Sequence, residues 1–174
     1  MLDKPSNDPQ ISARDVLVKL GIKTMPVPVE KIAKALGAVV RFSPLDEELS
    51  GMVYIKDGVP VIGVNSLHHP NRQRFTIAHE IGHLVMHRNM ISEHVHVDKQ
   101  FRVLMRDSKS STGSEEIEVQ ANQFAAELLI PSSMFDPTKI IASDIDDDGP
   151  LDELAKKFRV SKQMLEYRIR NSNT

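Results

Sequence analysis

The chain has 174 residues, of which 40% are hydrophobic and 26% are charged, a mix typical of one globular domain or of one domain with a small appendage. Its 22 basic and 24 acidic residues give a formal charge of −2, which excludes a strong overall field for attracting nucleic acid or an anionic membrane but allows a local basic patch. The sequence has no cysteine, so disulfides and thiolate metal ligands are excluded and a transition-metal site must use histidine and carboxylate.

The N-terminal part combines a loose terminus with two short helices. Residues 1–10 are rich in proline and polar residues and lack the apolar run of a secretory signal. Apolar spacing predicts helices over 11–20 and 29–36, which are followed by Gly21 and Gly37, the residue type that ends helices in the left-handed conformation. Because no stretch approaches the roughly 18 apolar residues that cross a bilayer, we expect a soluble cytoplasmic protein without a membrane partner.

Short β-branched runs replace the helical spacing in the next segment. Residues 38–42 are typical of a strand, and residues 51–55 and 59–64 flank an Asp-Gly pair that favours a hairpin turn. Pro60 has no backbone donor, so we expect its strand to present an edge there. An extended peptide could then add as a further strand along either arm of the hairpin.

Two long helices are predicted next, over residues 71–88 and 115–130, the second ended by a proline. Residues 89–115 between them are polar, with 108–114 expected to be mobile, and we hypothesise that this segment acts as a lid. We predict one domain over 1–140.

A C-terminal region, predicted over 141–174, contains two short helices at 151–158 and 161–170 that resemble a helix-turn-helix. Basic side chains outnumber acidic ones in this pair: Lys156, Lys157, Arg159, Lys162, Arg168 and Arg170. DNA contact is one interpretation. We favour the other, in which the basic face packs within the protein or docks a partner protein.

Residues 79–83 read His-Glu-Ile-Gly-His within the first long helix. Residues four apart lie one above the other on a helix, so His79 and His83 can bind one metal ion. Glu80 lies about 100° round the helix, where its carboxylate can take a proton from metal-activated water and return it to the leaving amine. The pattern also arises by chance, but two imidazoles and a carboxylate buried together need something to satisfy them. Gly82 costs about 1 kcal/mol relative to alanine in a helix, which indicates a close approach to its backbone.

A catalytic zinc site needs a third protein ligand and one open position. His87 continues the four-residue series but lies about 12 Å along the axis from the first histidine, too far to close a tetrahedron. His94 and His96 could reach the site from the polar segment. Glu118 is the better candidate, with Asn122 one turn later on the same face to orient one of the two histidines. The alternative for Glu118 is an exposed helix carboxylate.

Two segments resemble the motifs of a known family, the ImmA/IrrE metallopeptidases: RFTIAHEIGH at 74–83, and E-x-x-A-N-x-F-A-A-x-L-L-x-P at 118–131. The family often has a glutamate where this chain has Gln120, which leaves Glu118 as the matching acid. The resemblance implies an α+β fold, a small zincin-like domain of a short antiparallel sheet and an active-site helix, with helix-turn-helix-like C-terminal helices. It also implies Zn²⁺, or Mn²⁺, and cleavage of a partner transcriptional repressor or antitoxin-like protein in stress or mobile-element control.

Two other functions stay open. The chain could be a DNA- or repressor-binding regulator whose metal site is structural or vestigial, or a metallohydrolase that acts on a small amide. The sequence does not identify the group that stabilises the oxyanion, for which Tyr54, His87, His94 and His96 are all candidates.

Overall fold

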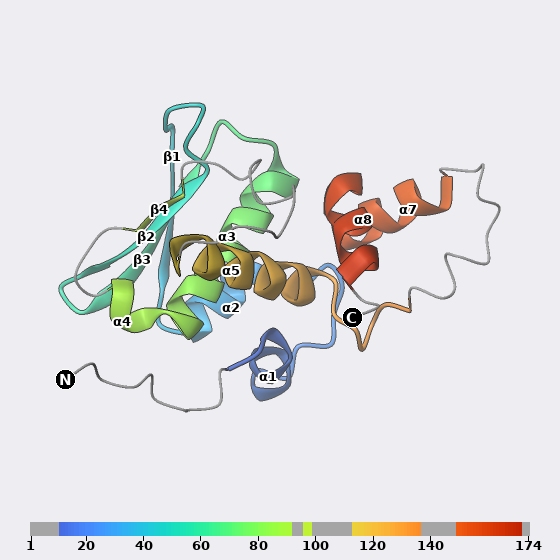
Figure 1. Cartoon of the computed structure of the whole chain (residues 1–174), viewed down its shortest axis with the longest axis horizontal. Coiled ribbons are helices and arrows are strands. Elements are labelled where there is room, and N and C mark those ends of the chain that lie inside the picture. Colours follow the sequence, from blue (N-terminus) through green and yellow to red (C-terminus); the bar gives the residue numbers. More distant parts are fainter. Residues whose placement is uncertain (1–10, 92–95, 99–112, 137–148, 172–174) are drawn as a thin grey trace.

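The computed structural model describes residues 11–91, 96–98, 113–136 and 149–171. These residues form an α+β fold in which α3 packs against a four-stranded sheet and α5 packs along α3 (Figure 1). The predicted fold class is confirmed in this respect. The predicted domain boundary between residues 140 and 141 lies outside the described residues, as does the predicted mobile stretch except for its last two residues, which begin α5.

The two N-terminal helices are α1 (Ala13–Lys19) and α2 (Val29–Ala35), within the predicted ranges. Each is followed by a glycine with positive φ, 63° at Gly21 and 82° at Gly37. The amide of Gly21 donates to Val18 O and the next amide donates to Leu17 O, the paired bonds that end a helix when one residue turns left-handed. The two glycines therefore end the helices as predicted.

The sheet contains β1 (Val39–Ser43), β2 (Gly51–Lys56), β3 (Val59–Asn65) and β4 (His96–Asp98), in the order β1-β3-β2-β4. The hairpin of β2 and β3 is confirmed, and Asp57 and Gly58 in its turn both have positive φ, at 50° and 78°. The sheet is mixed, because β1 runs parallel to β3.

Pro60 belongs to an interior strand, since β3 lies between β1 and β2, yet the strand has an open edge at the proline itself, as expected. The proline is tolerated because pairing with β1 begins one residue later, at Val61. The polar segment after α3 also contributes structure, because β4 pairs with the first three residues of β2.

Helices α3 (Pro70–Met86) and α5 (Gly113–Leu129) match the two predicted long helices, and a single turn, α4 (Arg88–Ile91), follows α3. Since α3 lies between the sheet and α5, ten consecutive residues from Phe75 to Leu84 are buried. No helix among the described residues has the length and apolar character that crossing a membrane requires.

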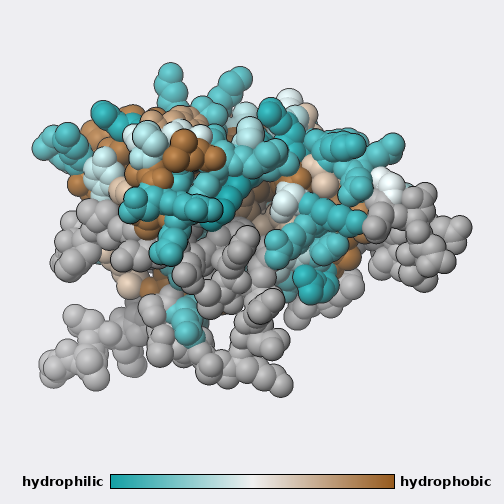
Figure 2. All heavy atoms as spheres, turned by 90° about the horizontal axis from the view of Figure 1, so that it is seen from above, coloured by the Kyte–Doolittle hydropathy of each residue, from teal (hydrophilic) through white to brown (hydrophobic). Residues whose placement is uncertain are grey.

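The exposed hydrophobic side chains lie partly on the sheet, where Val39 and Phe42 of β1 are 43% and 44% exposed. In Figure 2, hydrophobic side chains gather over the half of the molecule that contains the sheet, on the left in both views. The half that contains α7 and α8 shows mainly hydrophilic side chains on this face. The two halves thus present surfaces of different character.

The C-terminal helices are α7 (Gly149–Phe158) and α8 (Lys162–Arg170), with Ser161 as N-cap of α8 through a 3.1 Å bond from the Met164 amide. Their apolar residues belong to the same hydrophobic cluster as the sheet and α3; Phe158 is 1% exposed and Leu165 is fully buried. The turn between the helices is fixed to α3, since Asn71 Nδ2 donates to Val160 O at 3.1 Å.

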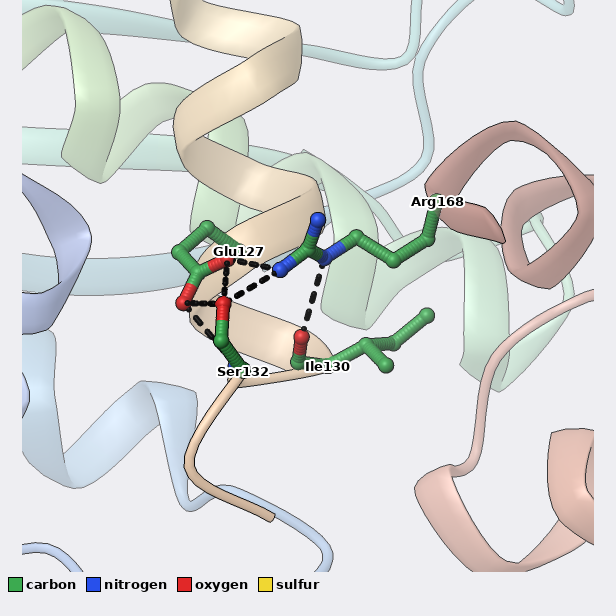
Figure 3. Close-up of polar contacts among 4 residues, drawn as sticks. All are labelled: Glu127, Ile130, Ser132 and Arg168. Carbon is green, nitrogen blue, oxygen red and sulfur yellow. Dashed lines mark hydrogen bonds and ion pairs between the residues drawn. The ribbon is translucent and has the colours of Figure 1, made fainter. Parts of the chain in front are cut away.

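Arg168 connects α8 to the end of α5 (Figure 3). Its Nε donates to Ile130 O at 3.1 Å, and a terminal nitrogen donates to Ser132 Oγ at 2.8 Å and to a carboxylate oxygen of Glu127. Arg168 is 8% exposed, so one basic residue of the predicted basic face serves packing.

We expect Arg168→Ala to lower the free energy of unfolding by about 2–3 kcal/mol, because it removes charged hydrogen bonds and leaves Glu127 without this partner. The expected loss is below that of a fully buried pair because the Glu127 side chain is 26% exposed. Urea denaturation of Arg168→Ala beside Arg170→Ala, an exposed residue of the same helix, measures the difference. Equal stability of the two variants would show that this contact does not hold α8.

Candidate metal centre

The three residues of the HExxH motif that carry chemistry are buried at the middle of α3. His79 and His83 are each 1% exposed, and Glu80 is fully buried. Pro70 at the first turn and the His69 side chain, which accepts from the Asn71 amide at 3.2 Å, start the helix well before the motif. The motif therefore lies on regular, fully packed helix.

Glu118 of α5 faces the two histidines. One carboxylate oxygen lies 3.1 Å from His79 Nε2, and the other lies 3.3 Å from His83 Nε2. The two Nε2 atoms are 2.9 Å apart. The side chain of Glu118 is 22% exposed, so the group sits at the edge of the core, with its carboxylate on the more accessible side.

Asn122 lies one helical turn after Glu118 and reaches the far side of His79. Its Oδ1 accepts a hydrogen bond from His79 Nδ1 at 2.9 Å. An imidazole that donates through Nδ1 keeps the lone pair of Nε2 free to bind a cation when the ring is neutral. Asn122, which is 8% exposed, therefore contacts His79 and not His83. The contact orients the His79 ring so that its Nε2 faces His83 and Glu118.

The close approach of α5 to α3 occurs at Gly82. A Cβ atom at this position would lie 3.3 Å from the backbone of Ala121 and 3.2 Å from the Phe124 ring. A side chain here would push α5 outward, and Glu118 and Asn122 with it. The close approach to the backbone of Gly82 that the sequence indicated is therefore the packing of α5 against α3.

The start of β2 presses against the other side of the motif. A Cβ on Gly51 would lie 2.3 Å from Thr76 Cγ2, 2.7 Å from Gly63 O and 3.6 Å from Glu80 Oε1. Arg72 holds the preceding residue in place, through a 2.8 Å bond to Ser50 Oγ. The backbone of β2 thus forms one wall beside the Glu80 carboxylate, a contact that sequence reasoning missed.

His87 takes part in the contact between the helices but not in the group of three. Its Nε2 donates to Gln120 Oε1 at 2.8 Å, and its ring centre lies 5.6 Å from that of His83. Tyr54 lies on the face of β2 opposite Gly51 and Val53, so it faces away from α3. His94 lies outside the described residues, and only the backbone of His96 is described, as part of β4.

The donor set fits a divalent metal ion. His79, His83 and Glu118 offer ligand atoms that all lie within 4.8 Å of one another. Among the described residues, these three form the candidate metal-binding group. Ligands bound tetrahedrally at 2.0–2.1 Å from zinc lie about 3.3 Å apart, close to the separations of 2.9, 3.1 and 3.3 Å here. Two imidazoles and one carboxylate are also the ligands of several catalytic zinc sites.

Comparison with solved structures gives a match to a chain described as a Mycobacterium tuberculosis transcriptional regulator. The TM-score is 0.57 at 21% sequence identity, and the match covers 87% of this chain and 43% of the other. The likeness supports the small zincin-like fold, and the chain spans less than half the length of that structure. No curated protein matches the sequence.

The family comparison covers most of the chain. The model of Peptidase M78, described as the IrrE N-terminal-like domain, matches residues 33–170. The matched range includes the sheet, α3, α5 and the C-terminal helices, and it confirms the predicted resemblance to the ImmA/IrrE metallopeptidases. The chain therefore belongs to the M78 peptidase family of IrrE N-terminal-like domains.

Proposed function

We propose that this protein is a zinc-dependent endopeptidase that cleaves one or a few partner proteins, of the transcriptional repressor or antitoxin-like class. The observation that carries the proposal is the convergence of His79, His83 and Glu118 beside the fully buried Glu80. Membership of a peptidase family supports the reaction type. The class of substrate rests on the family resemblance.

In this proposal His79, His83 and Glu118 hold the metal, and Asn122 keeps His79 in the ligating tautomer. Zn²⁺ suits two imidazoles better than Mn²⁺ does. When bound, the ion supplies Lewis-acid catalysis, which polarises a carbonyl and makes water a nucleophile near neutral pH. Glu80 takes the proton from the water that attacks the scissile carbonyl and passes it to the leaving nitrogen.

The sheet supplies a place for an extended substrate. Strand β3 has partners on both sides, so the predicted addition of a peptide along 59–64 was wrong. The predicted addition along 51–56 is limited to residues 54–56, because β4 already pairs with Gly51–Val53. Strand β4 is the outer strand on the side of β2, whose Gly51 lies beside Glu80. We propose that the substrate pairs with this edge, which would bring its backbone toward the group of three.

A regulator that binds DNA or a repressor without cleaving it is the second candidate. The name of the matched structure, a transcriptional regulator, is the observation that favours it. Against it, Arg168 packs against α5, and Lys162 lies 3.9 Å from Asp152, which leaves fewer basic side chains on α7 and α8 for phosphates. Salt-dependent binding of operator DNA by the chain, without cleavage of any partner, would favour this candidate.

The test starts from the genome neighbourhood. Each neighbouring repressor or antitoxin-like protein is co-expressed with the chain, and one that disappears is purified and incubated with the purified chain. We expect one or few cleaved bonds, inhibition by 1,10-phenanthroline and recovery with one equivalent of Zn²⁺. His79→Ala should stay inactive and zinc-free after zinc is added, whereas His87→Ala, at the C-cap of α3 and outside the group, should still bind one equivalent. Cleavage that persists under chelation, or in His79→Ala, would contradict the proposal.

A further inference from the structure

A cavity separate from the metal centre lies between the N-terminal turn of α3 and the helices α7 and α8. Its volume is about 520 Å³, within the range of small-molecule sites. Its walls are fixed to each other, because Asn71 of α3 bonds to Val160 O, and Arg74 Nε donates to Arg159 O at 3.3 Å in the same turn. The cavity is therefore a preformed feature of the contact between α3 and the C-terminal helices.

Basic side chains line the rim of this cavity. Arg72, Lys156 and Lys162 contribute three positive charges, and Asp152 is the one acidic residue among the lining residues. The Lys162 ammonium lies 3.9 Å from Asp152 Oδ1, which compensates part of the charge. The first turns of α3 and α8 also line the cavity, and the positive ends of two helix dipoles add to the same sign. Because Asp152 offsets part of the positive charge, the rim favours an anion with a single negative charge.

The inner wall is apolar. Phe75, Ala155 and Met164 line the cavity, and the greater part of the lining surface is apolar. An inorganic phosphate or a nucleotide phosphate would leave these side chains without a matching apolar group. A carboxylate attached to a hydrocarbon chain satisfies both parts, because its head group meets the basic rim and its chain covers the apolar wall.

We propose that this cavity binds a small amphipathic carboxylate, a free monocarboxylic acid with a hydrocarbon chain. The ligand would contact Phe75, whose ring centre lies 6.0 Å from that of His79, and Arg72, which holds Ser50 next to the Gly51 wall of Glu80. Phe75 thus lies between the cavity and His79, and Arg72 connects the cavity to Glu80 through Ser50 and Gly51. Ligand binding at this site does not depend on the proposed peptidase activity.

Isothermal titration calorimetry of the full chain with sodium octanoate tests the proposal. We expect one saturable site with a Kd below about 1 mM, as for a small ligand of ten heavy atoms. Octan-1-ol, which has the same chain without the charge, should bind at least about tenfold more weakly. No saturable heat with octanoate, or equal binding of the alcohol, would overturn the proposal. Tighter binding of a short peptide with a free apolar C-terminus would overturn the choice of a free acid as ligand.

Charge variants locate the site. Replacing both Lys156 and Lys162 by Gln should weaken octanoate binding about tenfold, whereas Lys157→Gln, an exposed neighbour on α7 that does not line the cavity, should leave it unchanged. Asp152→Asn should tighten binding about threefold, a gain that misfolding cannot produce. Equal loss in the Lys157 variant, or weaker binding by Asp152→Asn, would show that octanoate binds elsewhere.

Discussion

Glu80→Gln is expected to keep one zinc ion per chain and to lose cleavage of the partner protein by at least about a hundredfold. An amide has nearly the size and shape of the carboxylate, so the fully buried side chain fits the same space between α3 and β2. The amide accepts no proton at neutral pH, and general acid–base catalysis typically contributes 10²–10⁴ to the rate. Single-turnover cleavage with metal analysis of the same sample measures both quantities.

Glu116→Gln provides the matched control for this experiment. Glu116 is an exposed carboxylate on α5, two residues from Glu118, and its replacement should leave cleavage unchanged because the side chain lies outside the site. Full cleavage by Glu80→Gln would refute the proposed role of the general base. Loss of zinc from this variant would instead make Glu80 a metal ligand and would contradict the assignment of Glu118 as the third ligand.

Gly51→Ala is expected to destabilise the fold by about 3 kcal/mol or more. The new methyl group would lie 2.3 Å from Thr76 Cγ2 and 2.7 Å from the carbonyl oxygen of Gly63. Neither neighbour is the end of a flexible side chain, so β2 must move away from α3 or from β3, and overpacking of this kind costs 1–3 kcal/mol or more. Chemical denaturation measures the stability, and zinc titration shows whether the displaced strand disturbs the metal centre.

Two further variants separate the contacts of Gly51. Gly63→Ala, in the paired strand, would meet Met52 Cγ at 3.0 Å, and since the Met side chain is flexible the loss should stay below about 1.5 kcal/mol. Adding Thr76→Ser to Gly51→Ala removes the closest clashing atom and should restore part of the stability. Equal losses in the Gly51 and Gly63 variants would show that the strand adapts freely, and the wall beside Glu80 would then not depend on this glycine.

Much of the local structure was predictable because its signals lie within a few residues of one another. Helix ends at Gly21 and Gly37 and the Asp-Gly hairpin depend on short-range hydrogen bonds and on permitted backbone angles. The approach of Glu118 to His79 and His83 was also predictable, since Glu118 shares a helix face with Asn122 and its segment resembles the second motif of the family.

Contacts between distant segments needed the tertiary structure. The parallel pairing of β1 with β3 places Pro60 in an interior strand, and β4 joins β2 from a segment whose polar composition indicated a loop. The sequence predicts Arg168 to be one member of a basic face, but in the structure its side chain is buried against Glu127. Charge and hydropathy along the chain do not show which surface a side chain meets after folding.

The sequence by itself identified the candidate donor groups of this protein: a histidine pair and a carboxylate at helical spacing, a candidate third acid, and the resemblance to the family. The tertiary structure alone decided what surrounds these groups. It places Gly51 beside Glu80, and it shows that Asn122 bonds to His79 and not to His83. It also forms the cavity between α3 and the C-terminal helices. The physical reason is that ligand spacing is a property of one helix, whereas walls and cavities arise where separate elements pack and depend on every side chain between them.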